Sequence, residues 1–139
     1  MTGAANLTGR RVLVVEDDYF IAYDTARTLR DAGAEVLGPC KSEAATRDLL
    51  ETEVPTHAVV DLNLGGGAPQ FEVAHLLKAR GMPFVFLTGY EANVITPDLR
   101  DVVHLNKPLA SGQLIEAIGR LWSPIQLPKT YIPKARAVS

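Results

Sequence analysis

The chain has little cysteine, few aromatic residues and no long hydrophobic run, and these shortages exclude several classes of protein. Cys40 is the only cysteine, so an internal disulfide and a zinc site built from cysteines are excluded. The longest apolar runs, such as 84–87, are far shorter than the roughly 20 residues of a membrane-spanning helix. Segment 1–8 lacks the basic and apolar stretches of a secretory signal. We therefore expect a cytoplasmic protein.

The chain also lacks an excess of charge of either sign. It has 14 Lys and Arg residues against 16 Asp and Glu residues, a net charge of −2. Proteins that bind nucleic acid usually carry a strongly basic face, so we expect no nucleic acid as a partner. The short apolar runs indicate no membrane partner either. The 139 residues correspond to one domain at roughly 150 residues per domain.

Short apolar runs alternate with amphipathic stretches along most of the chain. The apolar runs predict buried strands at 11–15, 35–38, 57–61, 83–87 and 102–106. Helical spacing of apolar residues predicts helices at 18–32, 42–52, 70–80 and from 111, the last with a stripe of Leu114, Ile115, Ile118, Leu121 and Trp122. Segment 91–100 contains Pro97, so any helix there is short. This alternation predicts an α/β fold with a parallel sheet and helices on both faces.

The residues at the ends of the predicted strands form a chemically coherent set. In chain order they are Glu16, Asp17 and Asp18, then Asp61, Thr88 and Lys107. In such sheets ligands bind beyond the carboxyl ends of the strands, so these side chains should meet. Clustered carboxylates repel one another, and a bound divalent cation would offset that repulsion. Mg²⁺ suits such a site because it prefers oxygen ligands. A metal ion, a hydroxyl and an ammonium around one carboxylate suit phosphoryl transfer.

The same motifs resemble the receiver domain of two-component response regulators. The matching segments are 13–18, 59–64, 87–89 and 106–108. The resemblance covers about 11–122 and implies a flavodoxin-like, doubly wound sheet of five parallel strands in the order 2-1-3-4-5. Segment 86–90 is similar to the motif of the FAT GUY receivers, a subgroup of single-domain regulators found in alphaproteobacteria, with Leu87 where the subgroup has Ala.

The resemblance implies a role for each site residue. Asp61 would accept a phosphoryl group from the phosphohistidine of a histidine kinase or phosphotransfer protein, and Thr88 and Lys107 would contact that group. Asp17 and Asp61 would hold Mg²⁺ through their side chains. Asn63 would bind the ion through its carbonyl, and Glu16 would reach it through water. The peptide bond between Lys107 and Pro108 would be cis.

The sequence departs from the family pattern at two places. Gly65, Gly66 and Gly67 stand where most receivers carry Met-Pro, and His104 stands where most carry an aromatic residue. Three residues are candidates for a conformational switch: Thr88, His104 and Tyr90. The glycines lack the spacing and the trailing Lys-Ser/Thr of a nucleotide-binding loop. Asp18 is expected to cap the following helix.

We predict a single-domain response regulator, not an enzyme, that signals through contacts with a downstream protein. Its parts are an N-terminal extension (1–10), the receiver domain (11–122) and a tail (123–139) whose apolar residues dock on the domain or a partner subunit. A homodimer is compatible with the sequence. One alternative is a receiver-like interaction module that is never phosphorylated. Another is a haloacid-dehalogenase-like phosphatase, which would want a second Asp where Asn63 stands.

Overall fold

The computed structural model describes residues 6–65, 67–89, 94–107 and 111–125. In this part the chain forms one five-stranded sheet in the order β2-β1-β3-β4-β5, with every neighbouring pair parallel. The strands are β1 (Arg11–Val15), β2 (Glu35–Cys40), β3 (His57–Val60), β4 (Phe84–Thr88) and β5 (Val103–Asn106). The predicted fold class and strand order are therefore confirmed.

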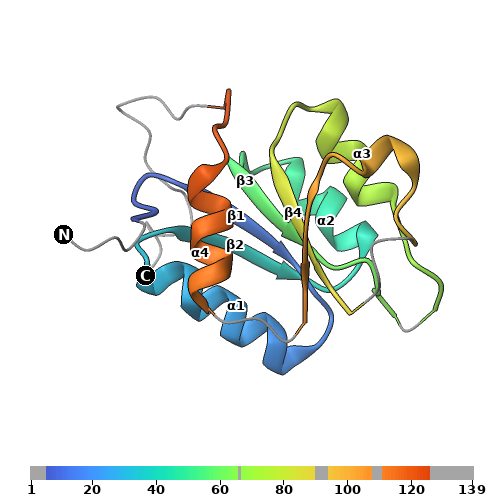
Figure 1. Ribbon diagram of the computed structural model, residues 1–139, viewed down its shortest axis with the longest axis horizontal. Coiled ribbons are helices and arrows are strands. Elements are labelled where there is room, and N and C mark those ends of the chain that lie inside the picture. The colour runs from blue at the N-terminus through green and yellow to red at the C-terminus, as the bar shows by residue number, and fades with distance from the viewer. Residues whose placement is uncertain (1–5, 66, 90–93, 108–110, 126–139) are drawn as a thin grey trace.

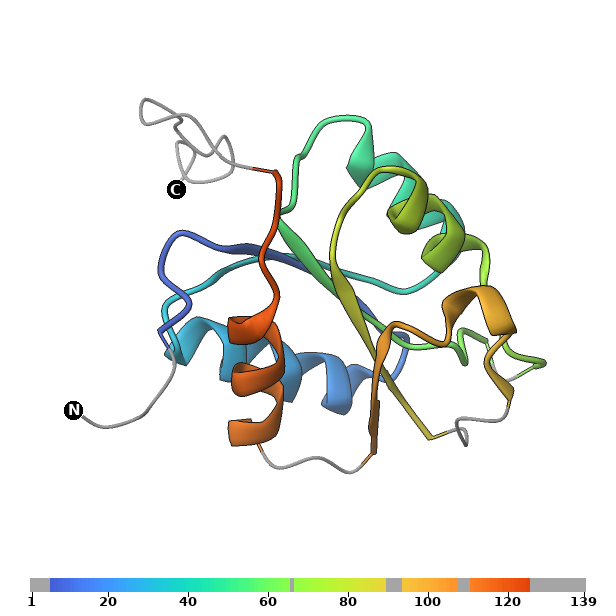
Figure 2. The same cartoon turned by 45° about the horizontal axis from the view of Figure 1, so that its top comes forward.

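Helices cover both faces of the sheet (Figure 1). They are α1 (Tyr19–Asp31), α2 (Glu43–Leu50), α3 (Glu72–Ala79) and α4 (Ser111–Arg120), with a short 3₁₀ helix, η2 (Pro97–Leu99), before β5. Figure 2 shows α1 and α4 on one side of the sheet and α2 and α3 on the other. In the described part of the chain, no helix is long and apolar enough to cross a membrane.

Alternate residues of the strands feed two apolar cores, one on each face of the sheet. In β1, Leu13 and Val15 pack on the α2 and α3 side, whereas Val12 and Val14 pack on the α1 and α4 side. All five residues of β1 are buried, as expected for a central parallel strand covered on both faces. The core also takes in Leu7, which is fully buried and donates its N–H to the carbonyl of Ala32.

Most element boundaries lie within one or two residues of the predicted ones, and the starts of α1 and α2 have clear causes. The Asp18 carboxylate accepts the Ile21 N–H at 3.0 Å, and the Ser42 hydroxyl accepts the Ala45 N–H at 3.1 Å, so both residues cap the helices that follow them. In the described part of segment 91–100 there is no α-helix, and η2 spans only three residues, which agrees with the short helix predicted from Pro97.

The C-terminal end of the last helix was predicted wrongly. The apolar stripe of α4 was expected to include Trp122, but α4 ends at Arg120 and Trp122 is 76% exposed. Leu114 and Ile118 are buried. Beyond the helix the 3.6-residue spacing no longer determines which side chains face the core, so the stripe stops there.

Strand β2 runs two residues further than predicted because it contains an irregularity. The pairing with β1 shifts between Leu13 and Val15, and Cys40 pairs with Val15. Gly38 makes the shift with a positive φ of +91°, and an added Cβ would lie 2.8 Å from the Cys40 nitrogen. Only glycine fits there. The Gly38–Pro39 peptide is cis. The predicted cis bond before Pro108 lies outside the described residues.

Candidate functional site

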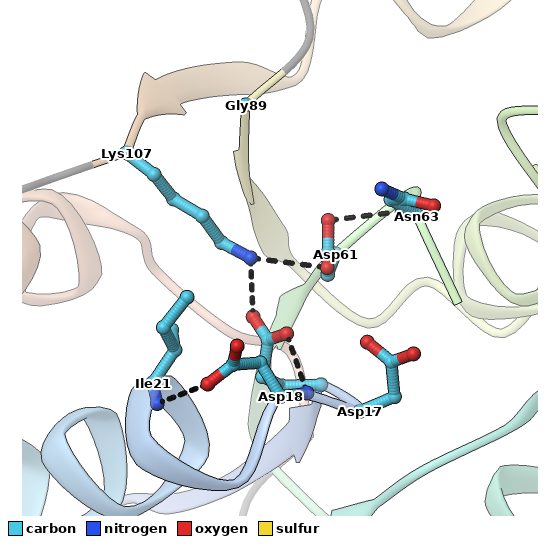
Figure 3. Close-up of a pocket in the computed structure, with 8 residues that line it drawn as sticks. Asp17, Asp18, Ile21, Asp61, Asn63, Gly89 and Lys107 are labelled. Carbon is cyan, nitrogen blue, oxygen red and sulfur yellow. Dashed lines mark hydrogen bonds and ion pairs between the residues drawn. The ribbon is translucent and has the colours of Figure 1, made fainter. Parts of the chain in front are cut away.

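The carboxyl ends of β1, β3 and β5 bring four of the predicted residues together. Glu16 and Asp17 follow β1, Asp61 follows β3 and Lys107 follows β5. They lie around an open cavity of about 450 Å³ (Figure 3). The lining residues are Glu16, Asp17, Asp18, Ile21, Asp61, Asn63, Gly89 and Lys107. The convergence at one edge of the sheet therefore holds for the acids and the amine.

Lys107 is the positive charge of the site. Its Nζ lies 2.7 Å from Glu16 Oε1 and 3.1 Å from Asp61 Oδ2. Figure 3 shows the Lys107 side chain pointing from the end of β5 toward Asp61. Glu16 and Asp61 are only 4% and 3% exposed. Buried charges need partners, and one ammonium here faces two carboxylates.

The three acids are arranged as ligands for a cation. One carboxylate oxygen each from Glu16, Asp17 and Asp61 lies within 4.8 Å of the others. Oxygen donors with several carboxylates suit Mg²⁺, which keeps some of its waters. Asp17 is exposed, so an ion could reach it from solvent. The residues present therefore fit a magnesium ion.

Backbone N–H groups hold the carboxylates in place. The Asn63 N–H donates to Asp61 Oδ1 at 3.0 Å, and the Gly65 N–H donates to Asp17 Oδ2 at 2.8 Å. The Asp18 N–H donates to Glu16 Oε2 at 3.1 Å. Each acid of the cluster is thus oriented by a backbone donor, from either its own strand end or the loop that follows β3.

The charge arrangement changes the proton affinity of two site residues. Burial raises the pKa of Glu16 to about 7, with a further increase from the Asp61 charge, against hydrogen bonds from Lys107 and the Asp18 N–H that lower it. Burial alone would lower the pKa of Lys107, but the Glu16 hydrogen bond and the Asp61 charge outweigh it and raise that pKa. The buried carboxylates of Glu16 and Asp61 therefore share the single positive charge of Lys107.

Metal-free protein is expected to lose stability as the pH rises from about 4.5 to 7, the range between the unfolded and folded pKa values of Glu16. The folded state holds the Glu16 proton more tightly than the unfolded chain, so its ionisation lowers the free energy of unfolding by up to about 3 kcal/mol. Denaturant unfolding in EDTA at pH 5 and pH 8 measures this loss.

The control for this prediction is Glu16→Gln, which keeps a side chain of the same size but has no proton to lose. Burial lowers the pKa of His57, which gives stability the opposite pH dependence in part of this range. That contribution is common to both proteins, so it cancels in their difference. Equal pH dependence in wild type and Glu16→Gln would contradict the assignment.

The structure places the three switch candidates differently from one another. Thr88 is fully buried at the end of β4 and is not among the residues that line the cavity. Its carbonyl accepts the Lys107 N–H at 3.0 Å. His104 is half-buried on β5, in register with Phe86 of β4. Tyr90 lies outside the described residues.

Two residues of the cavity wall were not predicted from the sequence. Ile21 lies in the first turn of α1 and Gly89 directly follows β4. Gly89 belongs to the quoted 87–89 motif, so its place after Thr88 was a usable signal. Ile21 carries no such signal, because an apolar residue in an amphipathic helix is expected to face the core.

Comparison with known proteins gives one consistent class. No model of a known protein family matches the chain. The chain is 28% identical over 120 residues to the transcriptional regulatory protein PdtaR of Mycobacterium tuberculosis, across 84% of this chain. It spans 58% of the length of PdtaR.

Two solved structures match this chain over nearly their whole length. The BeF₃-activated conformation of SdrG from Pseudomonas melonis Fr1 is 30% identical, with a TM-score of 0.68 over 80% of this chain and 97% of that one. A response regulator receiver protein from Sinorhizobium medicae WSM419 is 26% identical, with a TM-score of 0.68 over 83% of this chain and 95% of that one. Together with the sheet order and the acidic strand ends, these matches define the class. The chain belongs to the response regulator receiver domains of two-component signalling.

Proposed function

We propose that this receiver domain is phosphorylated on Asp61 in a magnesium-dependent reaction and signals through contacts with another protein. The observation that carries the proposal is the position of Asp61. Its carboxylate is 3% exposed, lies on a cavity and has Lys107 on one oxygen and the Asn63 N–H on the other. The other two acids that could share a cation with it lie within 4.8 Å.

In the proposed reaction an Asp61 oxygen attacks the phosphorus atom of a phosphohistidine. The new P–O bond forms as the P–N bond breaks, and the imidazole nitrogen keeps the electron pair. Asp17 and Asp61, with the Asn63 carbonyl, would hold Mg²⁺, which supplies positive charge beside the phosphoryl oxygens. Lys107 places a second positive charge next to Asp61. This charge would stabilise the negative equatorial oxygens of the phosphoryl group during its transfer.

Lys107 also links the modified residue to β5. A phosphoryl group on Asp61 brings new negative oxygens toward an ammonium that already pairs with Glu16. Thr88 and His104 are proposed to respond to this change, since both lie in the paired strands β4 and β5. Phosphorylation would then shift the population of two arrangements of this edge of the sheet.

The proposed partners are a histidine kinase or phosphotransfer protein as phosphodonor and a downstream protein as target. SdrG is described in a BeF₃-activated conformation, and beryllofluoride mimics a phosphoryl group, which supports phosphorylation as the signal in this chain as well. PdtaR is described as a transcriptional regulator. For this chain we propose a protein target, because the net charge of −2 does not favour nucleic acid. We propose that the chain acts in the cytoplasm.

Incubation with acetyl phosphate tests the proposal, because acetyl phosphate presents a transferable phosphoryl group without a kinase. We expect one phosphoryl addition per chain by intact-mass spectrometry with Mg²⁺ and none with EDTA. Phosphorylation that is equally fast in EDTA would contradict the metal requirement. A protein that neither binds Mg²⁺ nor gains mass would be the unphosphorylated interaction module instead, and continuous turnover of small phosphate esters would indicate a phosphatase.

A further inference from the structure

The loop between β3 and α3 reaches Asp17, at the end of β1, through Gly65. The Gly65 N–H donates to Asp17 Oδ2 at 2.8 Å, across 48 positions of the chain. Asp17 is exposed. An exposed carboxylate has several rotamers available, and this bond selects one of them.

We propose that Gly65 is a positioning residue for magnesium: its N–H fixes the Asp17 carboxylate in the orientation that a cation shared with Asp61 requires. This inference rests on the proposed magnesium site. A carboxylate has two oxygens and several lone pairs, so Asp17 can accept the Gly65 N–H and still bind a cation. Hydrogen bonds to metal ligands commonly set their orientation and strengthen metal binding.

The backbone of Gly65 explains why a glycine is needed for this contact. Its φ is +97°, in the region that residues with a Cβ rarely adopt. An added Cβ at Gly65 would meet no atom within 4 Å. The restriction therefore comes from the backbone conformation and not from a clash with neighbouring atoms, and a residue that avoids this φ would turn its N–H away from Asp17.

The rest of the loop is anchored, so that Gly65 is held where it can reach Asp17. Leu62 and Leu64 are buried, at 0% and 5% exposure. Gln70 closes the loop from its other end: its backbone N–H donates to the Leu62 carbonyl at 2.9 Å, and its side-chain amide donates to the Leu64 carbonyl at 2.7 Å. The carbonyl of Leu64 belongs to the peptide unit whose N–H is that of Gly65.

Gly65→Ala and its matched control, Gly67→Ala, test the inference. Gly67 lies in the same loop with equal free space around a Cβ and no positive φ. We expect Gly65→Ala to weaken Mg²⁺ binding about 10-fold, measured by calorimetric titration. Gly67→Ala should bind like wild type and keep the wild-type metal-free melting temperature. Gly65→Ala should melt at a somewhat lower temperature, because alanine is strained at a positive φ, but it should remain folded at the temperature of the titration. Gly65→Asn should recover part of the loss, since Asn enters positive φ more readily than Ala.

A second measurement needs neither metal nor a glycine variant. In metal-free protein, Asp17→Ala removes the acceptor and should speed hydrogen exchange of the Gly65 amide several-fold relative to wild type, without changing exchange of the Gln70 amide. Equal Mg²⁺ affinity in Gly65→Ala and wild type, equal losses in both alanine variants, or unchanged Gly65 exchange would each overturn the inference. A wild-type protein that binds no Mg²⁺ would instead overturn the proposed function.

Discussion

Asp61→Asn is expected to reduce phosphorylation by acetyl phosphate in the presence of Mg²⁺ at least about 100-fold, because an amide lacks the anionic oxygen that attacks phosphorus. The fold should survive the change. The amide oxygen can still accept the Asn63 N–H, now 3.0 Å from Asp61 Oδ1, and Lys107 keeps its 2.7 Å pair with Glu16. Intact-mass spectrometry over a time course measures the rate.

The control for Asp61→Asn is Asp48→Asn, the same chemical change on an exposed acid of α2. It should be phosphorylated at the wild-type rate. If Asp61→Asn were labelled as fast as Asp48→Asn, the phosphoryl group would be attached elsewhere and the assignment of Asp61 would be wrong.

Asp17→Asn is expected to weaken Mg²⁺ binding at least about 100-fold. Changes to groups that only orient a metal ligand typically cost 10–100-fold, and Asp17 is a proposed direct ligand. Asp17 is also the most accessible acid of the cluster, whereas Glu16 and Asp61 are buried and share Lys107. Calorimetric titration with MgCl₂ gives the dissociation constants. Wild type should also gain thermal stability with Mg²⁺, because a ligand that binds only the folded state stabilises it.

Asp18→Asn is the matched control for Asp17→Asn. Asp18 lines the same cavity, but its carboxylate caps α1 by accepting the Ile21 N–H. Asparagine caps helices about as well as aspartate, so the variant removes one nearby charge and leaves the ligands and the fold intact. We expect a change of only a few-fold. Equal losses in both variants would indicate that Mg²⁺ responds to the overall charge, without Asp17 as a ligand.

The sheet and the acidic edge could be predicted because they depend on local patterns. Short apolar runs identify parallel strands covered on both faces, and the acids that directly follow β1 and β3 are placed by the ends of those strands. Lys107 follows β5 in the same way. Parallel neighbouring strands end at the same edge of the sheet, so the sequence alone predicts that these residues lie near one another.

Features that depend on loop conformation or on distant partners could not be predicted. The bond from Gly65 to Asp17 requires a positive φ in a loop whose glycines allow many conformations. The ion pairs of Arg11 are another example: its buried side chain, 2% exposed, pairs with Glu35 and Glu53 at 3.2 Å and 2.8 Å. Nothing local to Arg11 indicates those partners.

The burial of Thr88 at the end of β4 could not be predicted from the sequence either. Thr88 was expected beside the phosphoryl group, because it closes β4 at the same edge as the acids. Thr88 is fully buried, and the residue after it, Gly89, lines the cavity. Successive residues of a strand point to opposite faces, so the direction at the last position depends on where the strand ends. The proposed role of Thr88 in phosphorylation remains a prediction.

Mapping the modified residue tests the central claim most directly. Protein treated with acetyl phosphate and Mg²⁺ is reduced with borohydride, which converts an aspartyl phosphate to homoserine, and the digested peptides are sequenced by mass spectrometry. We expect homoserine at position 61 alone, absent when EDTA replaces Mg²⁺. Homoserine at another acid, or none in protein that has gained a phosphoryl group, would contradict the account.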